Sequence, residues 1–148
     1  MCANSSERGF TLPELVAVLV IVGVLAVVAL PKFDAGLSLR SDAWRDEVVA
    51  ALRTARQTAV SHRRLVCASV AGSSVTLSIA PANPATACGA ALPGPGGTAA
   101  VSPAGVLYFQ PSGRVTSDGA GSTTSDRSIA ISGTGDPITV VGETGHVR

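Results

Sequence analysis

The sequence predicts an α+β fold, in which one long N-terminal helix packs on an antiparallel β-sheet. The first observation is an apolar segment that continues into an amphipathic pattern with helical spacing, over residues 10–62. The second is a series of short alternating segments separated by Gly, Pro and Ser turns over residues 65–148. The chain has 148 residues and a formal net charge of +1. One domain beside the apolar segment is therefore expected, and bulk charge requires no polyelectrolyte partner.

The apolar segment contains no charged or strongly polar residue from Leu15 to Leu30. Counted from Phe10, it forms a helix about 31 Å long at about 1.5 Å per residue. This length matches the roughly 30 Å hydrocarbon core of a bilayer, so residues 10–31 are predicted to form a transmembrane helix. Gly23 and Pro31 each weaken a continuous helix, so a kink is expected between them.

Two other interpretations of this segment remain open, a secretory signal peptide and a plain membrane anchor. The run Ala26–Ala29 contains small residues, as a signal-peptide cleavage site does. However, the apolar run exceeds the usual length of about 7–15 residues, and Met1–Gly9 carries no net side-chain charge. A glutamate inside the run, Glu14, is also unexpected in a signal peptide.

The second half of the predicted helix is amphipathic and ends near residue 62. Its opposite face carries charged residues, among them Arg45, Asp46 and Arg53. Because such a stripe must pack on another element, the strands that follow are its expected partner. The residues of the stripe are Leu37, Ser41, Trp44, Val48, Leu52, Ala55 and Ala59.

Strand patterns begin directly after this helix. Leu65–Ala71 and Ser74–Ala80 alternate around Gly72-Ser73, which predicts a β-hairpin. Residues 81–97, rich in Pro and Gly, and Ser117–Ser125, rich in Gly, Ser and Thr, are predicted loops. The remaining predicted strands are Gly105–Gln110, Ser128–Ser132 and Ile138–Val141.

The residues in front of the apolar helix form a specific motif, Arg8-Gly9-Phe10-Thr11-Leu12-Pro13-Glu14. It resembles the class III signal of type IV pilins and type II secretion pseudopilins. The resemblance implies a leader peptide of residues 1–9 that a prepilin peptidase removes after Gly9, and N-methylation of Phe10. It also implies that Glu14 neutralises the N-terminal amine of an adjacent subunit in a filament. The alternative is a glutamate at the depth of the lipid headgroups.

Further motifs resemble the H-type pseudopilins of type II secretion and the T-type minor pilins, which form the GspH/FimT family. The resemblance implies a pilin-like fold and a single-pass protein of the bacterial inner membrane, with residues 32–148 in the periplasm. It implies a minor subunit, at the tip of a type IV pilus or a type II secretion pseudopilus, whose partners are other pilin or pseudopilin subunits. The choice between the two machines stays open. The motifs are Leu52-Arg53-x-Ala55-Arg56-x-x-Ala59-Val60, Arg64-x-Val66-x-Ala68, Tyr108-Phe109-x-Pro111-x-Gly113-Arg114 and Thr144-Gly145-x-Val147.

Cys67 and Cys88 are the two cysteines that remain after removal of a leader containing Cys2. An even number in an exported domain favours a disulfide, which would close a loop of about 20 residues and stabilise the domain by about 3 kcal/mol. Two unpaired buried thiols are the alternative. No catalytic constellation, cofactor motif or zinc-type spacing is found, because the two histidines and two remaining cysteines are too scattered. The sequence therefore predicts no enzyme, cofactor or metal.

Binding of double-stranded DNA during natural transformation is the alternative function. Arg53, Arg56, Arg63 and Arg64 follow one another near the helix end, and arginine is a good phosphate ligand. Some T-type minor pilins bind DNA through a C-terminal Gly-Arg-x-Arg motif, which Gly145-His146-Val147-Arg148 resembles. His146 replaces the first arginine, and histidine is mostly neutral at pH 7. A solvated helix face, with Asp42, Asp46 and Glu47 as neighbours, also accounts for the helix arginines.

Overall fold

The computed structural model describes residues 11–97 and 99–148, without the side chains of residues 28–38. The chain divides into two compact units, residues 1–37 and residues 38–148. One helix, α1 (Leu12–His62), begins in the first unit and ends in the second. The helix predicted over residues 10–62 is thereby confirmed for residues 12–62, whereas Phe10 and the leader lie outside the described residues.

The first unit contributes the apolar part of α1. Its large apolar side chains from Leu12 to Val27 are between 49% and 79% exposed. The helix continues without a break through Gly23 and Pro31 in the single chain. Among the described residues, no helix combines the length and apolarity that a membrane crossing requires.

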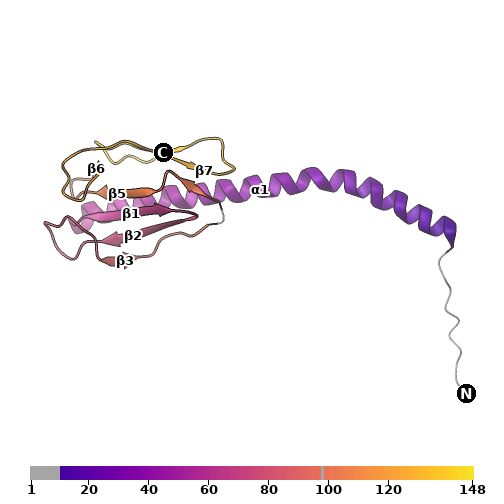
Figure 1. Cartoon of the computed structure of the whole chain (residues 1–148), viewed down its shortest axis with the longest axis horizontal. Helices are drawn as coiled ribbons and strands as arrows, with labels where there is room; N and C mark the ends of the chain where they lie inside the picture. The colour runs from indigo at the N-terminus through magenta and orange to yellow at the C-terminus, as the bar shows by residue number, and fades with distance from the viewer. Residues whose placement is uncertain (1–10, 98) are drawn as a thin grey trace, which may run out of the picture. The chain divides into compact units, whose positions relative to one another are not determined.

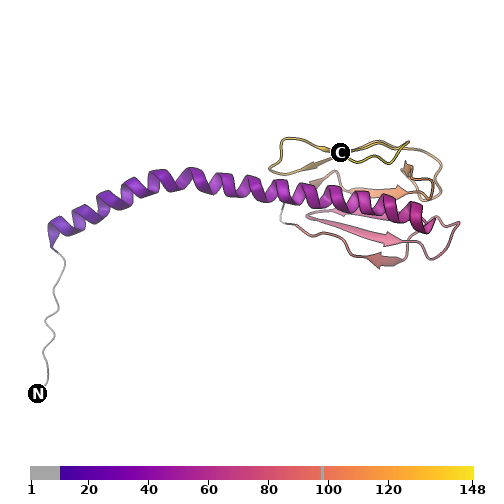
Figure 2. The same ribbon diagram turned by 180° about the vertical axis from the view of Figure 1, so that it is seen from behind.

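The second unit is built around the other half of α1, which covers one face of a β-sheet (Figures 1 and 2). The predicted stripe is confirmed here, because each of its apolar members from Trp44 onward is buried. Ser41 is half-buried, and the side chain of Leu37 lies outside the described part. The buried members are Trp44, Val48, Leu52, Ala55 and Ala59.

The larger sheet has five antiparallel strands in the order β3-β2-β1-β5-β6. The predicted hairpin forms its centre, since Val66 of β1 pairs with Ile79 of β2 on one side and Phe109 of β5 on the other. The strands are β1 (Val66–Ala71), β2 (Ser74–Ile79), β3 (Ala90–Leu92), β5 (Gly105–Phe109) and β6 (Val115–Thr116).

A second sheet has three antiparallel strands in the order β4-β7-β8. Its strands are β4 (Val101–Ser102), β7 (Arg127–Ile131) and β8 (Ile138–Val140). Residues from α1 and from both sheets join in one continuous core, with Phe109, Leu52, Ile129 and Ile138 among its largest fully buried side chains. This core includes Ala55 and Ala59 near the end of α1 and Val147 near the end of the chain.

Three strands were not predicted. β3 lies inside residues 81–97, which the sequence predicted to be loop, and β4 and β6 are also new. Each contains only two or three residues, too few to show alternation. They form because longer neighbours position them: β3 pairs with β2, β4 with β7 and β6 with β5.

The predicted disulfide between Cys67 and Cys88 is confirmed, with the two Cα atoms 6.1 Å apart. Cys67 lies in β1 and is buried, whereas Cys88 precedes β3 and is half-buried. The bond therefore ties the loop that follows β2 to the centre of the large sheet. It excludes the alternative of two unpaired thiols.

Candidate binding pocket at the C-terminal segment

The helix α1 ends in a Schellman turn. The backbone N–H of Arg63 donates to the carbonyl oxygen of Val60 at 3.3 Å, and that of Arg64 donates to Ala59 at 3.2 Å. Arg63 has a φ of +52°, in the left-handed region that this turn requires. Both arginine side chains are exposed at the turn.

The C-terminal segment, residues 144–148, returns alongside β8. Thr139 and Arg148 exchange two backbone hydrogen bonds of 2.8 and 3.0 Å, and Val147 is buried opposite Val140. Gly145 has a φ of +64° and lies against the carbonyl oxygen of Gly113, so a Cβ atom would clash there. Glycine is therefore required by both backbone conformation and space.

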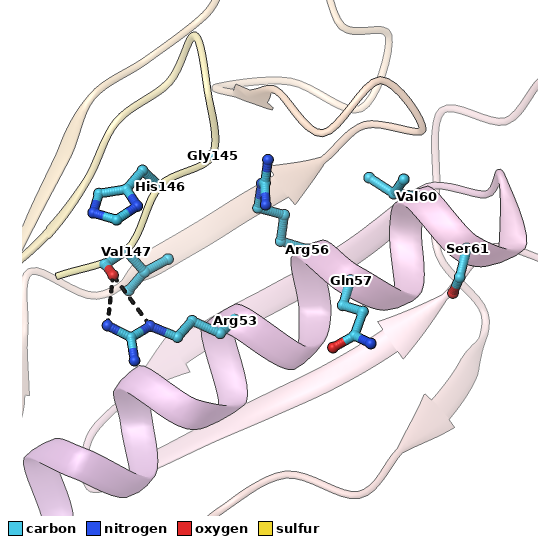
Figure 3. A pocket seen from close by; sticks show the side chains of 8 residues that line it. All are labelled: Arg53, Arg56, Gln57, Val60, Ser61, Gly145, His146 and Val147. Atoms are coloured by element: carbon cyan, nitrogen blue, oxygen red, sulfur yellow. Dashed lines mark hydrogen bonds between the residues drawn. The ribbon is translucent and has the colours of Figure 1, made fainter.

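Two arginines of α1 hold this segment against the helix. The Nε and Nη2 atoms of Arg53 donate to the carbonyl oxygen of Val147 at 3.2 and 3.0 Å, as Figure 3 shows. The Nε atom of Arg56 donates to the carbonyl oxygen of Thr144 at 2.9 Å. These bonds fix both guanidinium groups, because a carbonyl oxygen of the segment accepts from each.

Between the helix and the segment lies a cavity of about 510 Å³. We call it the C-terminal pocket, and Figure 3 shows its side chains. Its lining residues are Arg53, Arg56, Gln57, Val60, Ser61, Gly145, His146 and Val147. None of them is acidic, and neither arginine takes part in the ion pairs found within residues 11–97 and 99–148. The pocket is therefore suited to an anionic group.

The structure brings together only part of the residues predicted from sequence to bind DNA. Gly145 and His146 line the C-terminal pocket, but Arg63 and Arg64 do not. Arg148 is also outside the lining, and its Nε atom donates to the Thr139 hydroxyl at 2.9 Å. The sequence prediction did not identify the contributions of Gln57 and Ser61. The spacing of Gln57 and Ser61 at i and i+4 was the available signal, because it places both on one helix face.

Two carboxylates outside the C-terminal pocket have pKa values lowered by hydrogen bonds. Hydrogen bonds from the Thr124 hydroxyl and the Arg114 guanidinium lower the pKa of Glu143 below its ordinary value. The Arg114 Nη2 atom lies 2.8 Å from a Glu143 carboxylate oxygen. Backbone N–H groups, first that of Ser122, lower the pKa of Asp118. Asp118 accepts hydrogen bonds from the backbone N–H groups of Ser122 and Thr123, and Glu143 accepts one from the hydroxyl of the loop residue Thr124.

At the other end of α1, Glu14 contacts the residue before the helix. The backbone N–H and the hydroxyl of Thr11 both lie 3.5 Å from Glu14 Oε2, which are long hydrogen bonds. This is half of a capping box, in which the third helical residue accepts from the N-cap residue. Gly9 and Phe10, the predicted sites of cleavage and methylation, lie outside the described residues.

Comparisons with known proteins agree with this fold. The prokaryotic N-terminal methylation motif matches residues 4–30. This motif and the helix-on-sheet architecture are together similar to those of type IV pilin-like proteins.

The structure is similar to that of the type IV minor pilin FimU of Pseudomonas aeruginosa, with a TM-score of 0.52. The two chains share 20% sequence identity over 72% of this chain and 90% of the FimU chain. A second crystal form of FimU gives 21% identity and the same TM-score, with 85% of that chain covered. No curated protein matches the chain by sequence. At this level of identity, the similarity establishes the pilin fold, as the sequence predicted.

Proposed function

We propose that the chain is a minor subunit incorporated at the tip of a type IV pilus or a type II secretion pseudopilus. A prepilin peptidase removes residues 1–9, and residues 10–31 anchor the chain in the inner membrane, with the remainder in the periplasm. After assembly the same helix packs among the helices of other subunits.

The observation that carries this proposal is the exposed apolar surface of α1 between Leu12 and Val27, which lies within the residues that match the methylation motif. A contiguous exposed apolar surface of this kind marks an interaction with lipid or protein. Lipid can cover it before assembly, and the helices of adjacent subunits can cover it in a filament.

Glu14 is the residue that we assign to assembly. In a helix surrounded by apolar groups, a carboxylate is expensive unless a positive partner compensates it. The new amine of Phe10 on an adjacent subunit provides such a partner. The contacts with Thr11 offer a competing role, in which Glu14 only caps the helix.

Two variants of the full chain separate these roles. Glu14→Gln keeps a hydrogen-bond acceptor for Thr11 but removes the charge, whereas Glu14→Ala removes both. If Glu14 pairs with an amine, both variants are recovered in sheared filaments roughly tenfold less than wild type, with normal amounts in the membrane fraction. Wild-type recovery of Glu14→Gln together with a loss for Glu14→Ala would assign the residue to capping instead.

Leader removal is tested separately at Gly9. We expect Gly9→Val to accumulate as the unprocessed chain in membranes, detectable by the mass of its N-terminal peptide. Thr11→Val is the matched control, because it changes a neighbouring residue outside the predicted cleavage bond. Normal maturation of Gly9→Val would contradict cleavage after Gly9.

DNA binding is the second candidate function. It is supported by the exposed His146 and Arg148 in the C-terminal segment and by the absence of acidic groups around the C-terminal pocket. Titration of the full chain with a short DNA duplex, with Arg148→Ala as the control, tests it. Saturable shifts of the Arg148 amide resonance that weaken with salt and disappear in the variant would support DNA uptake.

A further inference from the structure

We infer that the C-terminal pocket is a receptor for a carboxylate group presented by a neighbouring pilin-like subunit. This inference rests on the proposed function, because it identifies a contact through which the subunit meets its neighbour outside the helical part of the filament. The evidence comes from the charge, the donors and the shape of the pocket.

The pocket carries positive charge that no lining residue compensates. Arg53 and Arg56 contribute two guanidinium groups, and none of the eight lining residues is a carboxylate. The ion pairs of the described residues join Arg45 with Asp46 and Arg114 with Glu143, all outside the lining. An entering anion would therefore form a new pair without breaking an existing one.

Arg53 and Arg56 are held in place, but some of their guanidinium N–H groups have no hydrogen-bond partner among the described residues. Arg53 uses Nε and Nη2 on Val147, and Arg56 uses Nε on Thr144. The Nη1 group of Arg53 and both terminal groups of Arg56 have no hydrogen-bond partner among the described residues. A planar guanidinium matches the two oxygens of a carboxylate, and groups that are already immobilised lose little entropy on binding.

The shape favours a single projecting side chain over a nucleic-acid backbone. The pocket is a depression bordered by the helix and the C-terminal segment, and Val60, 45% exposed, gives its wall an apolar part. An aspartate or glutamate side chain, or a chain terminus, brings one carboxylate on an apolar stem. DNA instead presents a row of phosphates, which is contacted by cations in a row. Arg63, Arg64 and Arg148, which would extend the row, are not in the lining.

Binding is measured with the full chain in neutral detergent micelles. The probes are a capped tripeptide with a central glutamate, its glutamine counterpart, and a short DNA duplex. We expect the glutamate peptide to shift the amide resonances of Gln57, Ser61 and His146, with at least about tenfold tighter binding than the glutamine peptide. Equal binding of the two peptides, or shifts of these amides by DNA alone, would overturn the inference.

Variants at Ser61 test the charge directly. The Ser61 hydroxyl donates to the carbonyl oxygen of Thr58 at 3.3 Å and takes no part in holding the C-terminal segment. Ser61→Asp places a carboxylate in the pocket and should weaken binding of the glutamate peptide by at least about tenfold. The neutral variant Ser61→Asn should weaken this binding less. Arg56→Gln removes one of the two guanidinium groups and should also weaken binding of the glutamate peptide. Arg45→Gln is the control, because Arg45 also donates to a backbone carbonyl oxygen, that of Asp136, but lies outside the pocket.

The same Ser61 variants, produced in cells, separate this inference from the proposed function. We expect Ser61→Asp to be recovered in sheared filaments several-fold less than Ser61→Asn, with both in equal amounts in membranes. Equal recovery of the two variants in filaments would refute the inference while leaving the proposed function intact. Absence of the wild-type chain from filaments would refute the proposed function itself, and with it the neighbouring subunit that the inference requires.

Discussion

The two halves of α1 differ in where their apolar side chains are buried. Between Leu12 and Val27 the large apolar side chains are at least 49% exposed, whereas Trp44 is 4% exposed and Leu52 is fully buried. Both halves have the same helical backbone. The first presents apolar groups on all sides and the second in one stripe, and only the stripe finds a sheet within the second unit.

This difference shows which parts of the helix depend on other molecules. The second half is stabilised by its own domain, because its stripe is removed from water by strands of the same chain. The first half gains nothing comparable within its own unit, so its apolar side chains stay exposed to water unless another molecule covers them. Substitutions in the two halves should therefore affect different measurements.

The largest effect is expected from matched leucine substitutions. Leu52→Ala removes a fully buried side chain and should lower the free energy of unfolding of the domain by about 2–5 kcal/mol. Leu19→Ala, at a position 63% exposed, should change it by less than about 0.5 kcal/mol. Urea unfolding of the full chain in detergent, followed by fluorescence of the single tryptophan, Trp44, measures both. Similar losses for the two variants would remove the distinction between the halves.

The second-largest loss of stability is expected from removal of the disulfide. Replacement of Cys67 and Cys88 by alanine should destabilise the domain by about 3 kcal/mol, because the bond closes a loop with a sequence separation of 21. Reduction of the wild type should produce a similar loss, whereas reductant should not affect the double variant. Membrane insertion of the first half should be unchanged, since the bond lies in the second unit. An unchanged urea midpoint in the double variant would contradict this assignment.

The third-largest loss of stability is expected from substitution of Gly145, a glycine that lines the C-terminal pocket. Gly145→Ala puts a Cβ atom on a residue with left-handed backbone and makes it clash with the Gly113 carbonyl oxygen. Together these effects should lower the free energy of unfolding by more than about 2 kcal/mol. Gly72→Ala is the matched control. Its φ is +56° and its added Cβ meets nothing within 4 Å, so strain of about 1 kcal/mol remains. Equal urea midpoints for the two variants would show that the close approach at Gly145 is not a constraint.

The sequence predicted the elements whose signals are local. The stripe from Trp44 to Ala59 and the turn at Gly72 each lie within one helix or one hairpin, so periodicity and turn chemistry were sufficient. The short strands β3, β4 and β6 depend on partners elsewhere in the chain, and their residues show no pattern of their own. The loop prediction for residues 81–97 was wrong at β3 for this reason.

The C-terminal pocket could be predicted only in part. Arg53 and Arg56 hold residues that follow them by 94 and 88 positions, and no local pattern encodes such contacts. The resemblance of Gly145 and His146 to a family motif pointed to the correct segment. The sequence analysis placed four helix arginines together, and the fold brings only Arg53 and Arg56 of them beside Gly145 and His146.

The smallest effect concerns the pH dependence of the second unit. The pKa of Glu143 is lowered from 4.5 in the folded chain, first by the Thr124 hydroxyl and then by Arg114. A lowered folded pKa gives a stabilisation that is present above that ordinary value and is lost as the pH falls through the folded pKa. Wild type should therefore lose more stability between about pH 6 and about pH 3 than Glu143→Gln does.

Urea midpoints from Trp44 fluorescence at the two pH values measure this difference. Because Glu143 is largely exposed, solvent screens its interactions and the difference should be small. Glu143→Gln should keep a residual dependence, since backbone N–H groups also lower the pKa of Asp118. An identical pH dependence in wild type and Glu143→Gln would show that the contact with Arg114 and Thr124 does not stabilise the folded domain.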